Sequence, residues 1–151
     1  NSKTIYVDCG TTLEQLLELI PDDLALTIVC SSLNIADLTI RKPNLKLFLL
    51  GGFYDTTTAS FSGMDTEAVF GELVIGTGFF TAAGLDRDLG ATCTALQEVP
   101  LKRTAMANSR KRILVMDNSK IGKIHTARFG QIKDFDLILT EDGPLDTKIM
   151  D

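Results

Sequence analysis

Short aliphatic runs alternate along the chain with stretches whose apolar residues recur every three or four positions. The aliphatic runs predict β-strands at residues 4–8, 26–30, 46–50, 74–83, 113–116 and 137–140. The periodic stretches predict helices at residues 13–20, 34–40, 64–73 and 94–109, and residues 53–63, rich in Thr and Ser, predict a long loop. Strands that alternate with helices are typical of an α/β fold with an open, mainly parallel sheet and flanking helices.

The length and the composition favour one globular domain over residues 1–151. Hydrophobic residues make up 44% of the chain and charged residues 23%. No apolar run approaches the roughly 18 residues of a membrane span, and no signal peptide is visible. We therefore expect a cytoplasmic protein without a membrane partner. Because Asn1 leads almost directly into the first strand, we also expect a fragment of a longer protein.

Several predicted strands end in small or polar residues, which in an open α/β sheet face the ligand crevice. These ends are Asp8 to Thr12, Cys30 to Ser32, Gly51-Gly52, Gly84, and Asp117 to Lys120. Thr11 with Glu14, and Thr12 with Gln15, have capping-box spacing, so a helix is expected to start here with free N–H groups that suit an anion. The pattern predicts a crevice for a small, hydroxylated, anionic ligand. An ordinary β-α turn capped by Thr is the structural alternative.

The charge and the reactive residues exclude several functions. A net charge of −5 is wrong for a domain that grips nucleic acid by its own surface. Three cysteines without C-x-x-C spacing and a single histidine, His125, argue against a zinc site, a disulfide framework and a Ser-His-Asp triad. Neither a P-loop nor a complete G-x-G-x-x-G motif is present. Lys102, Arg103, Arg110, Lys111 and Arg112 form a basic run, which we interpret as a solvated helix face.

Five motifs, taken in order, carry a family resemblance that covers nearly the whole chain. They are D-C-G-T-T at 8–12, S-L-N-I-A at 32–36, L-G-G at 50–52, G-A-T-C-x-x-x-x-E-x-P-x-K-x-x-A-M at 90–106 and D-N-S-K-I-G at 117–122. As a set they resemble the effector-sensing domain of the DeoR family of bacterial transcriptional regulators. The resemblance implies a fold related to ribose-5-phosphate isomerase and a phosphorylated sugar as effector. Family members carry an N-terminal winged helix-turn-helix, which this chain lacks, so operator DNA would be bound only through that missing domain.

The resemblance also assigns roles to particular residues. The phosphate would be held by Gly10, Thr11, Thr12, Ser31, Ser32 and Lys120, and the sugar by Asp8, Gly51, Gly52, Gly84, Glu98 and Lys102. It implies no catalytic residue, metal or cofactor, and we expect a homo-oligomer. The chain has Cys30-Ser31-Ser32 where the family usually has T-N-S, and Gly76 and Ala83 where acidic residues are common. Deoxyribose 5-phosphate, which needs one polar partner fewer than ribose 5-phosphate, is the candidate effector.

Two other functions stay open at this stage. A sugar-phosphate aldose-ketose isomerase would need a base such as Glu98, although the acidic residues around Gly76 and Ala83 are missing. A structural oligomerisation module would have an empty crevice. Individual residues also have simpler roles: Glu98 in the first turn of a helix, Lys120 on the surface, Asp117 bonded to turn amides, and Gly51 and Gly52 in a turn.

Overall fold

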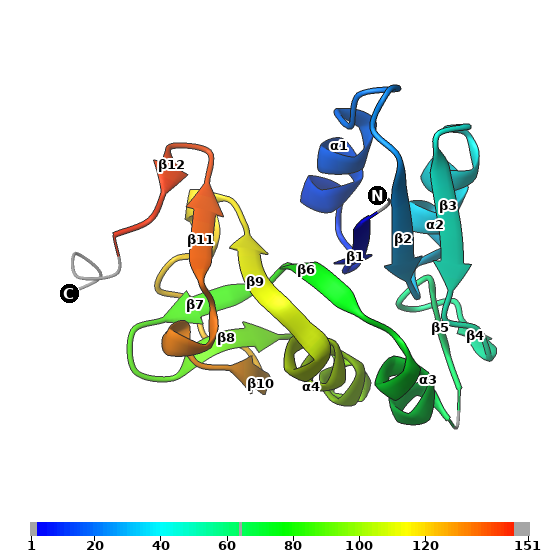
Figure 1. The fold of residues 1–151 in the computed structure, drawn as a ribbon. Coiled ribbons are helices and arrows are strands. Elements are labelled where there is room, and N and C mark those ends of the chain that lie inside the picture. The colour runs from blue at the N-terminus through cyan, green and yellow to red at the C-terminus, as the bar shows by residue number, and fades with distance from the viewer. Residues whose placement is uncertain (1–2, 64, 147–151) are drawn as a thin grey trace.

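A seven-stranded sheet forms the centre of the molecule in the computed structural model, which describes residues 3–63 and 65–146 (Figure 1). Its strand order is β12-β11-β9-β6-β1-β2-β3. The strands are β1 (Lys3–Val7), β2 (Leu26–Cys30), β3 (Leu45–Leu49), β6 (Ile75–Phe80), β9 (Ser109–Val115), β11 (Leu137–Thr140) and β12 (Gly143–Pro144). All neighbours in this sheet pair in parallel except β11 and β12. The predicted open, mainly parallel α/β sheet is therefore confirmed.

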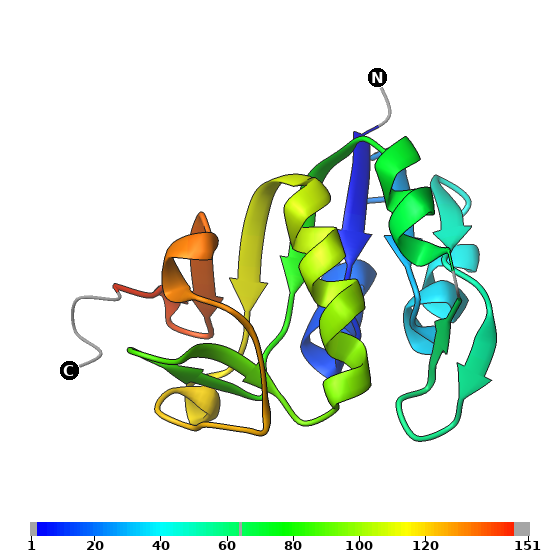
Figure 2. The same ribbon diagram turned by 90° about the horizontal axis from the view of Figure 1, so that it is seen from below.

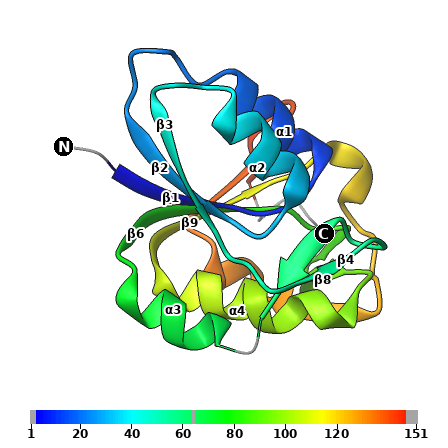
Figure 3. The same cartoon turned by 90° about the vertical axis from the view of Figure 1, so that its right-hand side faces the viewer.

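Helices cover both faces of this sheet, as Figure 3 shows. Helices α1 (Thr11–Glu18) and α2 (Leu33–Ile40) lie on one face, and α3 (Thr66–Glu72) and α4 (Val99–Asn108) lie on the other. Side chains alternate along β1 accordingly: Val7 packs in the cluster that contains Leu13 and Leu17 of α1, whereas Tyr6 packs with Phe70 and Phe80 in the other cluster. Strand β1 is thus buried on both sides, as parallel strands usually are.

Two smaller β-structures border the carboxyl ends of the central strands. A three-stranded antiparallel sheet has the order β10-β8-β7, with β7 at Gly84–Asp86, β8 at Gly90–Cys93 and β10 at Ala127–Gly130 (Figure 2). An antiparallel hairpin joins β4 (Phe53–Asp55) to β5 (Ser60–Ser62). The predicted loop at 53–63 is therefore wrong in part, because the hairpin occupies most of it. Three short 3-10 helices complete the elements: η1 (Leu96–Glu98), η2 (Asn118–Lys120) and η3 (Ile132–Asp134).

Several predicted helix boundaries need correction. Helix α1 begins after Gly10, and no side chain caps it, so neither Thr capping box forms. The helix expected at 94–109 begins later, because α4 follows directly on η1 and starts at Val99. The expected strand at 74–83 ends at Phe80. Met64, the predicted first residue of the third helix, lies outside the described residues, and α3 runs from Thr66 to Glu72.

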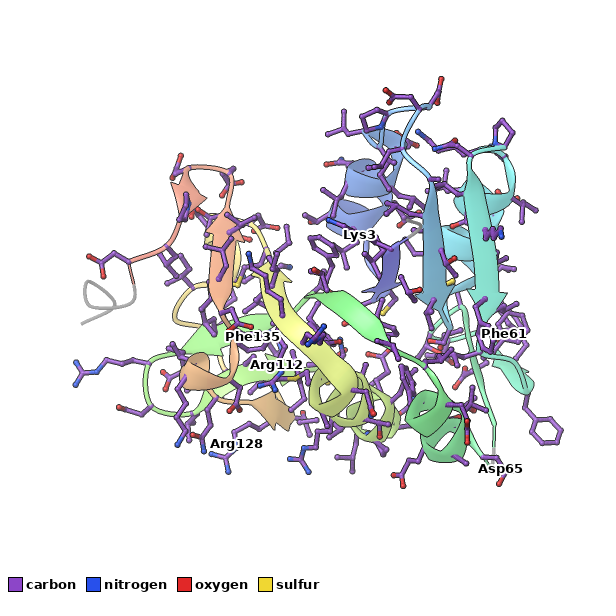
Figure 4. The ribbon with its side chains drawn as sticks, in the orientation of Figure 1. Lys3, Phe61, Asp65, Arg112, Arg128 and Phe135 are labelled. Atoms are coloured by element: carbon purple, nitrogen blue, oxygen red, sulfur yellow. The ribbon has the colours of Figure 1, made fainter. Side chains whose placement is uncertain are left out.

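The basic run is not a solvated helix face. Lys102 lies on the buried face of α4, together with Val99, Ala105 and Met106. Residues 110–112 belong to strand β9. The guanidinium of Arg112, labelled in Figure 4, donates from Nε to the carbonyl of Met106 (2.7 Å) and from Nη1 to that of Asp134 (3.1 Å). Only Arg103, Arg110 and Lys111 of the run are exposed.

Candidate functional site

The order of the strands places a crevice at the carboxyl end of β1. From β1 the chain builds β2 and β3 on one side, and it then returns to place β6 on the other side. Ligands of open α/β proteins bind at such a switch point, where the connections diverge from the carboxyl ends of two neighbouring strands. Two adjoining hollows lie here, and Cys9, Glu98 and Lys102 line both of them. We call them the helix hollow and the hairpin hollow.

The helix hollow has a volume of about 270 Å³ and lies at the start of α1. Gly10, Thr11 and Thr12 line it on one side, and Asp117 and Lys120 line it from the strand end after β9. Gly10 has a φ of 131°, which favours glycine, and a Cβ there would lie 3.3 Å from the Thr81 hydroxyl. Because no side chain caps α1, the N–H groups of its first turn have no intrahelical partner and no side-chain partner. The helix dipole adds partial positive charge at this end, so the hollow suits an anion.

A buried ion pair lies between the two hollows. Lys102 Nζ donates to Asp8 Oδ2 and, at 3.2 Å, to the carbonyl of Thr81. The two charged side chains are only 3% and 6% exposed, and the Lys102 ammonium also lies 4.7 Å from the centroid of the Phe129 ring. Backbone N–H groups of Cys9 (2.9 Å) and Thr81 (3.3 Å) donate to the Asp8 carboxylate. The pair is therefore well satisfied, and it ties α4 to the end of β1.

The surroundings of Lys102 favour its charged ammonium form. Burial is the largest single influence and lowers the pKa of Lys102, but the acidic groups around it, Asp8 foremost, together with the hydrogen bond to Asp8 outweigh burial and raise the pKa. The ammonium is therefore a poor nucleophile at neutral pH. Its charge is largely neutralised by Asp8, which leaves Lys120 as the more available cation beside the helix hollow.

Glu98 and Cys9 face each other across the boundary of the two hollows. The Cys9 thiol donates to Glu98 Oε1 at 3.9 Å, a weak hydrogen bond. Burial raises the pKa of Glu98, with the charge of Asp8 acting in the same direction. The Asp8 charge raises the pKa of Cys9 still more than burial does, so Cys9 is a neutral thiol. The residues that line both hollows are thus the Glu98 carboxyl group, the neutral Cys9 thiol and Lys102, whose charge is paired with Asp8.

The hairpin hollow is smaller, about 70 Å³, and lies between the strand ends and the β4–β5 hairpin. Asp55, Thr58 and Ser60 line it from the hairpin, and Asp8 and Ser31 line it from β1 and the end of β2. Phe61, labelled in Figure 4, comes from the same hairpin. Its backbone N–H donates to the carbonyl of Ser31 at 2.8 Å, and Leu33 N–H donates to the carbonyl of Ala59 at 3.0 Å. These bonds fix the hairpin over the crevice.

Most of the residues singled out in the sequence meet at these hollows. Gly10, Thr11, Thr12, Lys120, Glu98 and Lys102 line the helix hollow, and Asp8, Ser31, Glu98 and Lys102 line the hairpin hollow. The other four predicted residues, Ser32, Gly51, Gly52 and Gly84, do not line either hollow.

These four residues lie in other surroundings. The Ser32 hydroxyl caps α2 by accepting from Ile35 N–H at 3.3 Å. A Cβ at Gly52 would lie 2.0 Å from the carbonyl oxygen of Ser62, and one at Gly84 would lie 2.2 Å from that of Lys123, so both glycines allow close backbone packing. Gly51 lies beside a separate hollow near β3 and α3.

The sequence interpretation missed the lining residues that come from the hairpin and from the segment after β6. Asp55, Thr58 and Ser60 stand in the stretch that was expected to be a loop, and Thr81 stands in one expected to be a strand. The richness of residues 53–63 in Thr and Ser was the available signal. Residues 3–63 and 65–146 hold no group of three or more His, Cys, Asp or Glu side chains placed to bind a metal. None of the helices in these residues is long and apolar enough to span a membrane.

Comparison with known proteins gives one family and several relatives. Residues 1–142 match the model of the DeoR C-terminal sensor domain. The deoxyribose operon repressor of Escherichia coli K12 is 37% identical over 144 residues, 95% of this chain and 57% of the repressor. The glycerol-3-phosphate regulon repressor of the same strain is 28% identical, again over 95% of this chain and 57% of the repressor. The chain thus spans a little more than half the length of these relatives.

Among solved structures, ribose 5-phosphate isomerase A from Methanocaldococcus jannaschii is similar in fold. It aligns with 80% of this chain and 47% of its own, with a TM-score of 0.54 and 13% identity. At this identity the similarity concerns the fold alone, and it agrees with the isomerase-like fold that the sequence motifs implied.

Proposed function

Because this chain belongs to the family of DeoR C-terminal sensor domains, we propose that it binds a phosphorylated sugar and thereby controls a bacterial transcriptional repressor. Deoxyribose 5-phosphate is the proposed effector, since the deoxyribose operon repressor is among its similar relatives. A relative named for glycerol-3-phosphate supports the broader class of small phosphorylated polyols. Operator DNA would be bound by another part of the full-length, cytoplasmic repressor.

The observation that carries the proposal is the pairing of a helix start with a lysine across one hollow. Gly10, Thr11 and Thr12 at the start of α1 line the helix hollow together with Lys120. Uncapped backbone N–H groups and a mobile ammonium are the donors that bind phosphate in proteins. The helix hollow adjoins the hydroxyl-lined hairpin hollow, because some residues line both. One ligand can therefore extend from one hollow into the other.

Regulation requires that the effector bind two states of the repressor with different affinity. The crevice joins segments from both halves of the chain, since Gly10 follows β1 whereas Lys102 and Lys120 come from α4 and the turn after β9. A ligand held by both halves favours the arrangement in which they are closest. This arrangement would set the pose of the attached DNA-binding domain.

We propose binding without catalysis. The isomerase alternative has one observation in its favour, a partly buried Glu98 with a raised pKa beside both hollows. Incubation of the chain with ribose 5-phosphate, which has the 2-hydroxyl that aldose-ketose isomerisation requires, should leave the sugar unchanged by NMR. Turnover that disappears in Glu98→Gln would establish the isomerase instead.

A thermal-shift comparison of phosphorylated and free sugars tests the proposed function. Ligand at 100 times its Kd stabilises a protein by about 2.7 kcal/mol, which raises the Tm of a domain of this size by roughly 5 to 11 °C. We expect this shift with deoxyribose 5-phosphate and none with deoxyribose. Equal shifts from both would contradict phosphate recognition, and no shift from any phosphorylated sugar would contradict the proposed function.

A further inference from the structure

The two hollows differ in charge, which gives a bound ligand a direction. The helix hollow has the positive end of α1 and the ammonium of Lys120, which offset the carboxylate of Asp117, itself bonded to Ser119 N–H at 3.0 Å. Glu98 lines both hollows, so the hairpin hollow differs by having Asp8 and Asp55 and lacking Lys120 and the helix start. The hairpin hollow has the carboxylates of Asp55 and Glu98, while the third carboxylate, Asp8, is already paired with Lys102. An anionic group is therefore favoured in the helix hollow and repelled from the hairpin hollow, where a hydroxyl can donate to a carboxylate.

The volume of the hairpin hollow limits what can enter it. At about 70 Å³, against about 270 Å³ for the helix hollow, it has room for only a small end of a ligand. The C1 end of a pentose, with its single oxygen, is small enough to enter it. A second phosphate group would bring its negative charge next to the carboxylates of Asp55 and Glu98.

The hairpin also supplies neutral polar partners for such a group. The Thr58 and Ser60 hydroxyl oxygens lie 2.7 Å apart, so one donates to the other and the second keeps a proton for a ligand oxygen. Asp55 accepts from Thr57 N–H through Oδ1 at 2.8 Å, which fixes its carboxyl group. The backbone bonds of Phe61 and Leu33 hold the whole hairpin to β2 and α2. The partners are therefore in place before a ligand arrives.

We propose that the β4–β5 hairpin determines which phosphorylated sugar is bound, through Asp55, Thr58 and Ser60, by accepting only a short, uncharged, hydroxylated end remote from the phosphate. This inference rests on the proposed function, because it takes the phosphate to lie in the helix hollow. It adds a class of rejected compounds: bisphosphates and the phosphorylated acids in which the aldehyde carbon is a carboxylate.

Calorimetric titration with two matched ligands tests this selection. The ligands are 2-deoxyribose 5-phosphate and the 5-phosphate of 2-deoxyribonic acid, which differ at C1 by an aldehyde against a carboxylate. We expect the protein to bind the sugar at least about tenfold more tightly than the acid, because a like charge nearby disfavours the carboxylate. In Asp55→Asn, which keeps the shape, this ratio should fall at least about threefold.

Control variants separate the hairpin from general charge and from folding. Asp65→Asn removes the same charge from an exposed position outside the hairpin hollow, and it should leave the ratio unchanged. Thr58→Ala should weaken the binding of the sugar phosphate several-fold, whereas Thr56→Ala, at an exposed position of the same hairpin, should not. Neither change should alter the affinity for inorganic phosphate, since the helix hollow is untouched.

The outcomes distinguish this inference from the proposed function. If the sugar phosphate binds and Lys120→Ala weakens it, but Asp55→Asn keeps the ratio and Thr58→Ala keeps the affinity, the role of the hairpin is overturned and the proposed function stands. If neither 2-deoxyribose 5-phosphate nor the 5-phosphate of 2-deoxyribonic acid binds the wild-type protein, the proposed function and the role of the hairpin are both overturned. A wild type that prefers the acid to the sugar also overturns the role of the hairpin.

Discussion

At the scale of single residues, the ion pair of Asp8 and Lys102 lines the candidate site and also contributes to the stability of the fold. Both side chains are almost fully buried, and Lys102 is the cation that contacts the Asp8 carboxylate. Lys102→Met would keep the packing of α4 but leave a buried carboxylate without its partner. We expect it to lower the free energy of unfolding by about 3–5 kcal/mol in urea denaturation, as for other broken buried pairs.

The double variant Asp8→Asn with Lys102→Met is the control for this prediction. It removes both charges, so the cost should be smaller than that of Lys102→Met alone. A loss below about 1 kcal/mol in Lys102→Met would show that Asp8 stays hydrated and that the pair does not stabilise the fold.

Glu98 gives a prediction about pH at the same scale. Its pKa in the folded protein is raised, chiefly by burial, so the folded state binds a proton more readily than the unfolded state does. Between the unfolded pKa and the raised folded pKa, stability therefore falls as pH rises, and the penalty is complete above the folded pKa. Glu98→Gln removes the penalty. The Tm of the variant, relative to wild type, should be higher at pH 7 than at pH 4, and equal differences at the two pH values would contradict this account.

At the scale of elements, Ser32 has two alternative roles that can be distinguished by experiment: it caps a helix or it binds the phosphate. Its hydroxyl accepts from Ile35 N–H at the start of α2, and it does not line either hollow. Ser32→Ala should lower the stability by about 0.5–2 kcal/mol, as the loss of an N-cap does. Its affinity for a phosphorylated sugar, measured by calorimetry, should stay at the wild-type value. Ser31→Ala is the matched comparison. Because Ser31 lines the hairpin hollow, this variant should bind the phosphorylated sugar more weakly.

The long periodic elements could be predicted from the sequence, but the short ones could not. Strands such as β2 have a continuous aliphatic run, which marks them. Strands β4, β5 and β7 have only three residues each, too few for a period to be visible. These strands form because distant segments pair with them: Leu85 of β7, for example, pairs with Ala91 of β8.

The candidate site was predictable where residues follow a strand and unpredictable where tertiary contacts decide. Gly10 and Lys120 follow recognisable strand ends, and they line the same hollow. The hairpin residues Asp55 and Thr58 enter the crevice only because backbone bonds to Ser31 and Leu33 hold the hairpin there. The basic run by itself predicts a surface position for Lys102, because a helical pattern does not show that a distant Asp8 compensates a buried charge.

At the scale of the whole molecule, the fold brings two distant segments to one hollow, and this can be measured as coupling. A hydrogen bond to a charged group contributes about 1.5–3 kcal/mol, so Thr12→Ala and Lys120→Ala should each weaken the binding of phosphorylated sugars roughly 10- to 150-fold. Because neighbours on one ligand group rarely act additively, the double variant should differ from the sum of the single ones in calorimetric titration. Wild-type affinity in Lys120→Ala would place the phosphate elsewhere.

The position of β1 between β2 and β6 also bears on the order in which the crevice forms during protein synthesis. Asp8, Gly10 and the strands β2 and β3 leave the ribosome before β6 does, and β1, β2 and β3 pair with one another without it. Strand β6, the other neighbour of β1, and Lys102 emerge only later. Asp8 must therefore stay hydrated in the nascent chain until its counter-charge arrives. The helix hollow is thus complete only after the turn that carries Lys120 has emerged.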